Sequence, residues 1–239
     1  MPELEVIDFT KTAYHHKITA QIAGVILAPR RTLPKLSGEP GSWIPVMIVA
    51  ILLAITRWFV LPDLLATYES AEFVTKYAQT RNLTDIDAEN EIRLLRSAAP
   101  IVALVETPLI VFSGVAIVGF IVFSIGRMRF KSKVGYFPFY RLVAWSSIVS
   151  GIPLALTIPL KIINPNWSFP SNLSYILPGD WKSNYFYQIV QTLDVFLVWE
   201  VWLISIGFSA VCNVSIENSV RAIGTVFIIF IVLNALTLT

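Results

Sequence analysis

The chain has 239 residues, of which 55% are hydrophobic and only 14% are charged, and its formal net charge is +2. The charged residues gather in blocks between long apolar runs, which is the pattern of a polytopic membrane protein and not of a soluble domain. So small a net charge does not indicate nucleic-acid binding, and a single cysteine, Cys212, excludes an internal disulfide and a cysteine-based metal cluster.

Residues 1–43 precede the first long apolar run and are predicted to form a cytoplasmic N-terminal segment. Its apolar residues recur at helical spacing, which predicts a short amphipathic helix lying on the membrane surface. We expect this helix to end before Pro29, and the prolines and glycines of residues 34–41 predict a turn-rich link into the first span. The apolar residues at that spacing are Ile18, Ile22, Val25 and Ile26.

Five apolar runs are long enough to cross a bilayer, since a spanning helix needs about 20 mainly apolar residues. The runs are continuous, whereas the strands of an outer-membrane barrel would alternate over about ten residues. We therefore predict an all-α polytopic membrane protein in which residues 44–239 form five transmembrane helices. The spans cover about residues 44–61, 101–126, 140–163, 186–210 and 218–238.

The basic residues predict the orientation of these spans. They precede span one and crowd the link between spans two and three, whereas the link 62–100 is acid-rich and the link 164–185 is nearly uncharged. By the positive-inside rule, the two basic segments are cytoplasmic. We therefore expect a cytoplasmic N-terminus and an external C-terminus. The basic residues are Lys11, Lys17, Arg30, Arg31 and Lys35, followed by Arg127, Arg129, Lys131, Lys133 and Arg141.

The external link 62–100 is predicted to be a helical insertion. Residues 71–99 contain neither Pro nor Gly, which favours one or two short helices. Thr84 is a suitable N-cap for the second helix, because its hydroxyl can accept a hydrogen bond from the first turn. An acidic, solvated lid without chemistry is the simplest interpretation of this charge run.

Four ionisable side chains are predicted to share the outer part of the membrane. Counted along spans two and four, Glu106 lies ~8 Å and Asp194 ~12 Å below the outer boundary. Arg57 and Lys161 lie near the outer ends of spans one and three. Because an unpaired charge in hydrocarbon is costly, we hypothesise that the four form a polar cluster. Such a cluster either pins helices together by ion pairs or lines an outward-facing cavity.

Glu200 is the deepest acid, ~21 Å below the outer boundary. Glu200 lies six positions after Asp194, which places the two side chains about 120° apart around a regular helix. They therefore do not form a paired-acid site. We expect Glu200 to be protonated or hydrogen-bonded to a neighbouring helix.

No enzyme motif accompanies these groups. The sequence has no Ser/His or Cys/His arrangement, metal-binding motif or phosphate-cradling glycine loop, and both histidines lie in the N-terminal segment. We therefore expect a protein without enzymatic activity, metal or cofactor.

The second half of the chain carries two motifs of one family. An outer-loop motif comprises Asn164, Pro165 and Asn172, and a core motif comprises Asp194, Phe196, Trp199 and Gly207. With these residues the sequence resembles the Yip domain family. The resemblance implies a five-helix bundle with a cytoplasmic N-terminus. It also implies a prokaryotic inner-membrane protein, similar to proteins encoded with exporter-type ABC transporters, whereas eukaryotic members are linked to membrane trafficking. Glu200 departs from the family pattern.

Two functions remain open from the sequence. The first is a non-enzymatic scaffold or accessory subunit of a membrane complex, such as an ABC-type exporter or envelope or trafficking machinery. The alternative is a small transporter, channel or lipid-handling protein that uses the intramembrane carboxylates. Self-association around a pore is a further option, and the lipid bilayer is a partner in every case.

Overall fold

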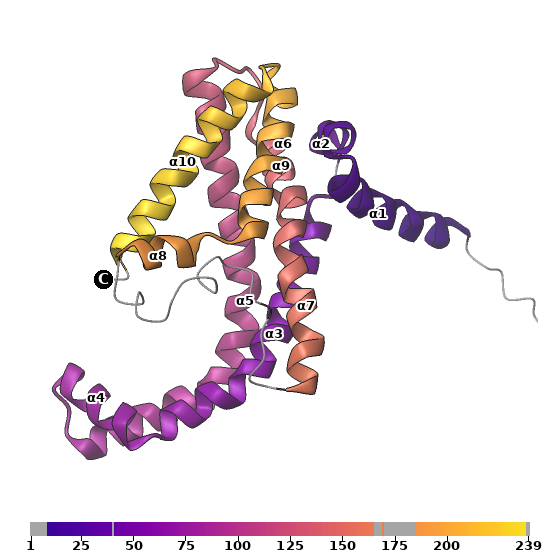
Figure 1. Cartoon of the computed structure of the whole chain (residues 1–239). Coiled ribbons are helices and arrows are strands. Elements are labelled where there is room, and N and C mark those ends of the chain that lie inside the picture. The colour runs from indigo at the N-terminus through magenta and orange to yellow at the C-terminus, as the bar shows by residue number, and fades with distance from the viewer. Residues whose placement is uncertain (1–8, 40, 165–168, 170–184, 238–239) are drawn as a thin grey trace, which may run out of the picture.

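A computed structural model describes residues 9–39, 41–164, 169 and 185–237, and all elements in these ranges are helical (Figure 1). The predicted all-α fold class is therefore confirmed. In chain order the helices are α1 (Phe9–Leu27), α2 (Pro29–Gly38), α3 (Trp43–Glu69), α4 (Ala71–Arg81), α5 (Asp85–Arg129), α6 (Tyr136–Ser146), the 3₁₀ turn η1 (Ser147–Ser150), α7 (Gly151–Ile163), α8 (Tyr185–Thr192), α9 (Val195–Cys212) and α10 (Ile216–Thr237).

Five segments of the described chain are long and apolar enough to cross a membrane, as predicted. They are α3, α5, the continuous stack of α6, η1 and α7, and the last two helices, α9 and α10. The 3₁₀ turn interrupts the third span at Ser147–Ser150. The orientation of the termini stays a prediction.

Helix α5 extends well beyond the predicted span two. It runs for 45 residues, through Pro100 and Pro108, with no second short helix before it. At 1.5 Å per residue it is ~68 Å long, whereas the hydrocarbon core of a bilayer is ~30 Å thick. A proline removes one backbone hydrogen bond without ending a helix that neighbours support. The prediction of short, separate helices before residue 101 is thus correct for α4 only.

The extra length of α5 builds an arm, which we define as residues 60–105. Here α3 and α5 run side by side away from the bundle and α4 closes the tip (Figure 1). Arg96 forms an ion pair with Glu69, and the Tyr77 hydroxyl donates to Glu91 Oε2 at 2.8 Å. Thr84 caps α5 as predicted, since its Oγ1 accepts from the Asp87 amide at 3.2 Å. These contacts give the arm a defined helical structure.

Residues 34–38 of the link before span one are helical, so the predicted turn-rich link is wrong for that part. Pro29 stands at the start of α2, where its missing N–H group costs nothing. Leu33 and Leu36 are buried on one side of α2, which packs against α6 and α9. Arg141 Nη1 donates to the Gly38 carbonyl at 3.1 Å and fixes the end of the helix. Burial of the two leucines outweighs the turn propensity of the prolines.

The core lies where α2, α5, α6 and α9 meet. Phe208 of α9 is fully buried, with its ring centroid 5.5 Å from that of Phe130 and 5.9 Å from that of Phe139. Beside it, Gly207 packs so closely on α6 that an added Cβ would lie 2.0 Å from Leu142 Cδ1. The absence of a side chain at residue 207 lets the two helices approach.

Candidate functional site

Arg57 and Glu106 of the predicted cluster are in contact. Arg57 Nη1 on α3 lies 3.4 Å from Glu106 Oε2 on α5, and the same nitrogen lies 3.3 Å from Thr107 Oγ1. The Thr107 side chain is buried and also donates to the Ala103 carbonyl at 2.5 Å. The Arg57 and Glu106 side chains are 34% and 51% exposed, so the pair is worth at most ~1 kcal/mol. Its main effect is to join α3 and α5 near the base of the arm.

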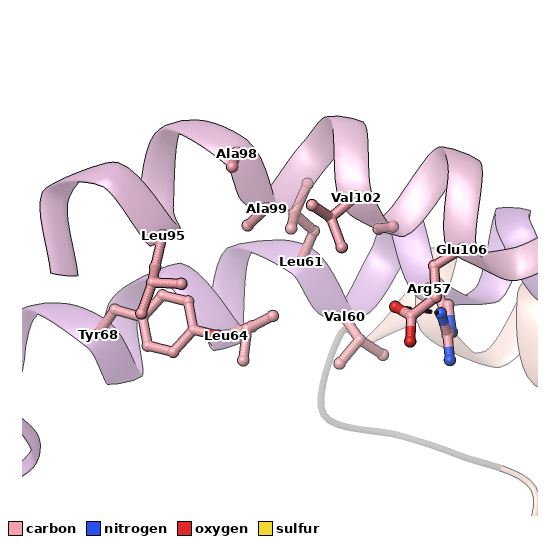
Figure 2. Close-up of a pocket in the computed structure, with 11 residues that line it drawn as sticks. Arg57, Val60, Leu61, Leu64, Tyr68, Leu95, Ala98, Ala99, Val102 and Glu106 are labelled. Carbon is pink, nitrogen blue, oxygen red and sulfur yellow. Dashed lines mark hydrogen bonds and ion pairs between the residues drawn. The ribbon is translucent and has the colours of Figure 1, made fainter. Parts of the chain in front are cut away.

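A groove opens beside this ion pair, between α3 and α5 (Figure 2). Its cavity measures about 410 Å3, with Arg57 and Glu106 at one end and Tyr68 and Leu95 at the other. The wall between the two ends is aliphatic, formed by Val60, Leu61, Leu64, Ala98, Ala99, Val102 and Ala103. Sequence reasoning missed this groove, because it depends on how α3 and α5 lie against each other.

Asp194 does not lie inside a transmembrane helix, which corrects the predicted start of span four. Helix α8 ends at Thr192, α9 begins at Val195, and Asp194 is the N-cap of α9 with an extended backbone. Its Oδ1 accepts from the Phe196 amide at 2.7 Å. A carboxylate at a helix N-terminus accepts a hydrogen bond from an otherwise unpaired N–H group and interacts favourably with the helix dipole. The chain therefore starts a new helix after Asp194.

Lys161 is 8% exposed near the end of α7. The ion pairs found between described residues do not join Lys161 or Asp194 to the Arg57–Glu106 pair, although both residues have interactions of their own. The predicted cluster of four residues therefore appears, among the described residues, as three separate features. These are the Arg57–Glu106 ion pair, the buried Lys161 and the Asp194 helix cap.

Glu200 contacts the third span across the bundle. Its Oε2 accepts a hydrogen bond from the hydroxyl of Ser150, the last residue of the 3₁₀ turn. The Glu200 side chain also lines an apolar cavity of about 230 Å3 between α5, α9 and α10. This agrees with the expected hydrogen bond to a neighbouring helix. Sequence reasoning did not identify Ser150 as the partner, although serine within an apolar run was an available signal.

The remaining predicted residues lie at helix ends and packing contacts. The Asn164 amide donates to the Leu160 carbonyl at 2.9 Å and closes α7, whereas Pro165 and Asn172 lie outside the described residues. Trp199 is partly buried against the core. The Phe196 ring lies 6.2 Å, between centroids, from that of Phe169. Within the described ranges, no three His, Cys, Asp or Glu side chains are placed to hold a metal ion.

The sequence model of the Yip1 domain matches residues 23–238, which is nearly the whole chain. The chain belongs to the Yip1 domain family. No curated protein and no solved structure matches it. The Yip1 domain of this protein takes in α2, the five spans and the arm, and it leaves out most of α1. It is therefore a membrane protein of this family, in contact with a lipid bilayer through its apolar helices.

The position of Asp194 yields a prediction that separates a helix cap from a transport group. Asp194→Ala should lower the free energy of unfolding by about 1 kcal/mol, because α9 loses its cap. Asp194→Asn and Asp194→Ser should retain most of the stability, since both residues cap helices well. Thermal unfolding of the purified variants in one detergent measures the difference. Equal losses for alanine and asparagine would show that the negative charge, and not the cap, is what matters.

Proposed function

We propose that this Yip1 domain protein is a non-enzymatic scaffold or accessory subunit of a membrane complex, and that its arm binds the partner. The observation that carries the proposal is an exposed apolar stripe on α5. Ile86, Leu94 and Ile101 are 74%, 68% and 67% exposed and fall within about 80° around the helix, with the exposed polar residues Asn90 and Ser97 between them. Large apolar side chains gathered on one exposed side are typical of a protein-binding surface.

The geometry of the arm supports this role. Helix α5 is more than twice as long as the ~30 Å hydrocarbon core of a bilayer is thick, so part of it projects beyond the hydrocarbon. The ion pair of Arg96 with Glu69 and the hydrogen bond of Tyr77 with Glu91 hold the projecting part in a defined shape. A preformed surface binds at a lower entropic cost than a segment that must first become ordered.

The ionisable groups of the spans favour a scaffold over the alternative, a small transporter or channel. The Arg57–Glu106 ion pair joins α3 to α5, and Asp194 caps α9. Glu200 accepts a hydrogen bond from Ser150, which links the fourth span to the third. The first and the last of these contacts fix helices relative to one another, and the Asp194 cap stabilises the start of its own helix. An exporter-type ABC transporter is the partner that the family resemblance favours, in a prokaryotic inner membrane.

Co-purification from native membranes tests the proposal. We expect one membrane protein to be recovered with the tagged chain in constant ratio, and its complex to assemble poorly in a deletion strain. Ile86→Ser combined with Leu94→Ser should reduce recovery at least about tenfold, because two apolar contacts are lost. Leu27→Ser is the matched control, since Leu27 is 82% exposed at the end of α1, far from the arm (Figure 1).

The absence of any co-purifying protein, together with normal complex assembly in the deletion strain, would refute the scaffold role. Flux of a solute through proteoliposomes that is lost in Asp194→Asn would favour the transporter instead.

A further inference from the structure

The cavity between α5, α9 and α10 combines apolar walls with a single acidic group. Its volume is about 230 Å3, and of the described residues that line it only Glu200 can carry a charge. The other lining side chains are aliphatic or aromatic. Apolar walls with one placed polar group are typical of a site for a small organic molecule.

This cavity is open to the lipid-facing side of the bundle. Ile117 of α5 and Phe230 of α10 line it, and they are 61% and 57% exposed. Helix α10 diverges from α5 towards its C-terminal end (Figure 1). Since both helices are spans, a molecule dissolved in the hydrocarbon can reach Glu200 without passing through water.

The volume of the cavity limits the size of its occupant. Because one water-sized group takes ~30 Å3, the cavity holds about eight non-hydrogen atoms. A second cavity of about 350 Å3 between α5 and α10 shares Ile121, Ile125 and Val226 with the first. A tail that is too long for the first cavity can therefore continue between the same two helices. A slender molecule with a short alkyl tail suits this space.

Glu200 determines the chemistry of the polar end of the ligand. Ser150 donates to its Oε2, and Oε1 can still bond to a ligand. An anionic ligand would place a second negative group beside Glu200, with no base among the described lining residues. A neutral amine can instead take the carboxyl proton, so that the O–H bond breaks, an N–H bond forms, and an ammonium–carboxylate pair results. Such a pair is held more tightly in apolar surroundings than in water.

We propose that this cavity binds a small lipophilic amine, with the amine nitrogen at Glu200 and the alkyl tail between α5 and α10. The amine enters from the bilayer uncharged and becomes charged at Glu200. An alcohol of the same length fills the same space but gains only a neutral hydrogen bond. The site does not depend on the scaffold role of the arm, which shares no residue with the cavity.

Labelling of the full chain in detergent with diisopropylcarbodiimide, a small hydrophobic reagent, tests this site. The carboxyl O–H adds across a C=N bond of the reagent, so that a C–O bond forms and the proton moves to nitrogen. The adduct rearranges to a stable N-acylurea, which peptide mass spectrometry quantifies at Glu200. N,N-dimethylhexylamine should halve the labelling rate at a concentration about tenfold lower than hexanol needs, since a charge-assisted hydrogen bond is stronger than a neutral one. Hexanoate should not protect Glu200.

Two variants and one reference residue control this experiment. Val226→Phe places a ring in the cavity and should abolish most of the labelling at Glu200. Leu233→Phe is the matched control, because Leu233 is exposed on α10 and lies outside the lining of the cavity, so its labelling should equal that of the unmodified chain. Glu217, an exposed acid in the first turn of α10, is the reference carboxyl in every sample.

Four results would overturn the proposed amine site. They are a Glu200 that the carbodiimide does not label, equal protection of Glu200 by the amine and by hexanol, equal protection of Glu200 and Glu217 by the amine, and unchanged labelling in a folded Val226→Phe variant. The comparison of ligands uses the unmodified chain, so it decides the matter if Val226→Phe does not fold.

Discussion

Gly207→Leu should lower the thermal unfolding temperature of the protein by about 10 °C, since overpacking a core costs ~1–3 kcal/mol and so close a contact lies at the upper end of that range. An added Cβ at residue 207 would lie 2.0 Å from Leu142 Cδ1, and Leu142 is fully buried. Helices α6 and α9 must then separate, which disturbs the packing of Phe208 beside them. Thermal unfolding in a fixed detergent, followed by loss of the monodisperse peak, measures the shift.

Gly114→Leu is the control, because a Cβ at residue 114 meets nothing within 4 Å. We expect its unfolding temperature to stay within about 2 °C of the original, as is usual for surface substitutions. Combining Gly207→Leu with Leu142→Ala should recover part of the loss, because the second change restores space. Equal destabilisation by Gly207→Leu and Gly114→Leu would show that close contact of α6 and α9 is not what residue 207 provides.

Ser150→Ala should destabilise the protein by about 1–3 kcal/mol, because the partly buried Glu200 carboxyl group loses its hydrogen-bond partner inside the membrane-spanning bundle. The Ser150 hydroxyl donates to Glu200, whose side chain also lines an apolar cavity. Glu200→Leu should cost less, because leucine suits that cavity and the freed hydroxyl can bond to a backbone carbonyl one turn earlier. A double-mutant cycle in a reversible unfolding assay gives the coupling energy.

Ser113→Ala is the matched control for this cycle. Ser113 is exposed on α5 and donates to the Leu109 carbonyl of its own helix at 2.6 Å. Its loss should change stability by no more than about 0.5 kcal/mol. A Ser150→Ala effect as small as this, or additive effects of the Ser150 and Glu200 substitutions, would contradict a tie between the third and fourth spans.

Hydropathy alone predicts the number of spans and the all-α class, because crossing a bilayer requires long apolar helices. It locates the ends of helices poorly. Asp194 stands in an apolar run, so the run reads as continuous, although aspartate is a preferred N-cap. Residues 34–41 are predicted to form a link because of their prolines and glycines, whereas burial of Leu33 and Leu36 against other helices makes the segment up to Gly38 helical.

The contacts of the candidate sites differ in how far they could be predicted without the tertiary structure. The cost of unpaired charge predicts from the sequence that Arg57 and Glu106 each meet an opposite charge, but it leaves open which partner each of them has. Thr107 and the groove could not be predicted in this way, since they depend on the alignment of α3 with α5 along the arm. Ser150 likewise meets Glu200 only because the third span contains a 3₁₀ turn at that level.

Photocrosslinking from the arm in native membranes tests the central claim, that the arm binds a protein partner, most directly. A photoreactive residue at Leu94 should crosslink one membrane protein in good yield, because this exposed position lies on the apolar stripe of α5. The same residue at Ile228 of α10, which is 62% exposed on a span, should crosslink mainly lipid. If the Leu94 probe also yields only lipid adducts, the arm lies on the bilayer and the scaffold account is wrong.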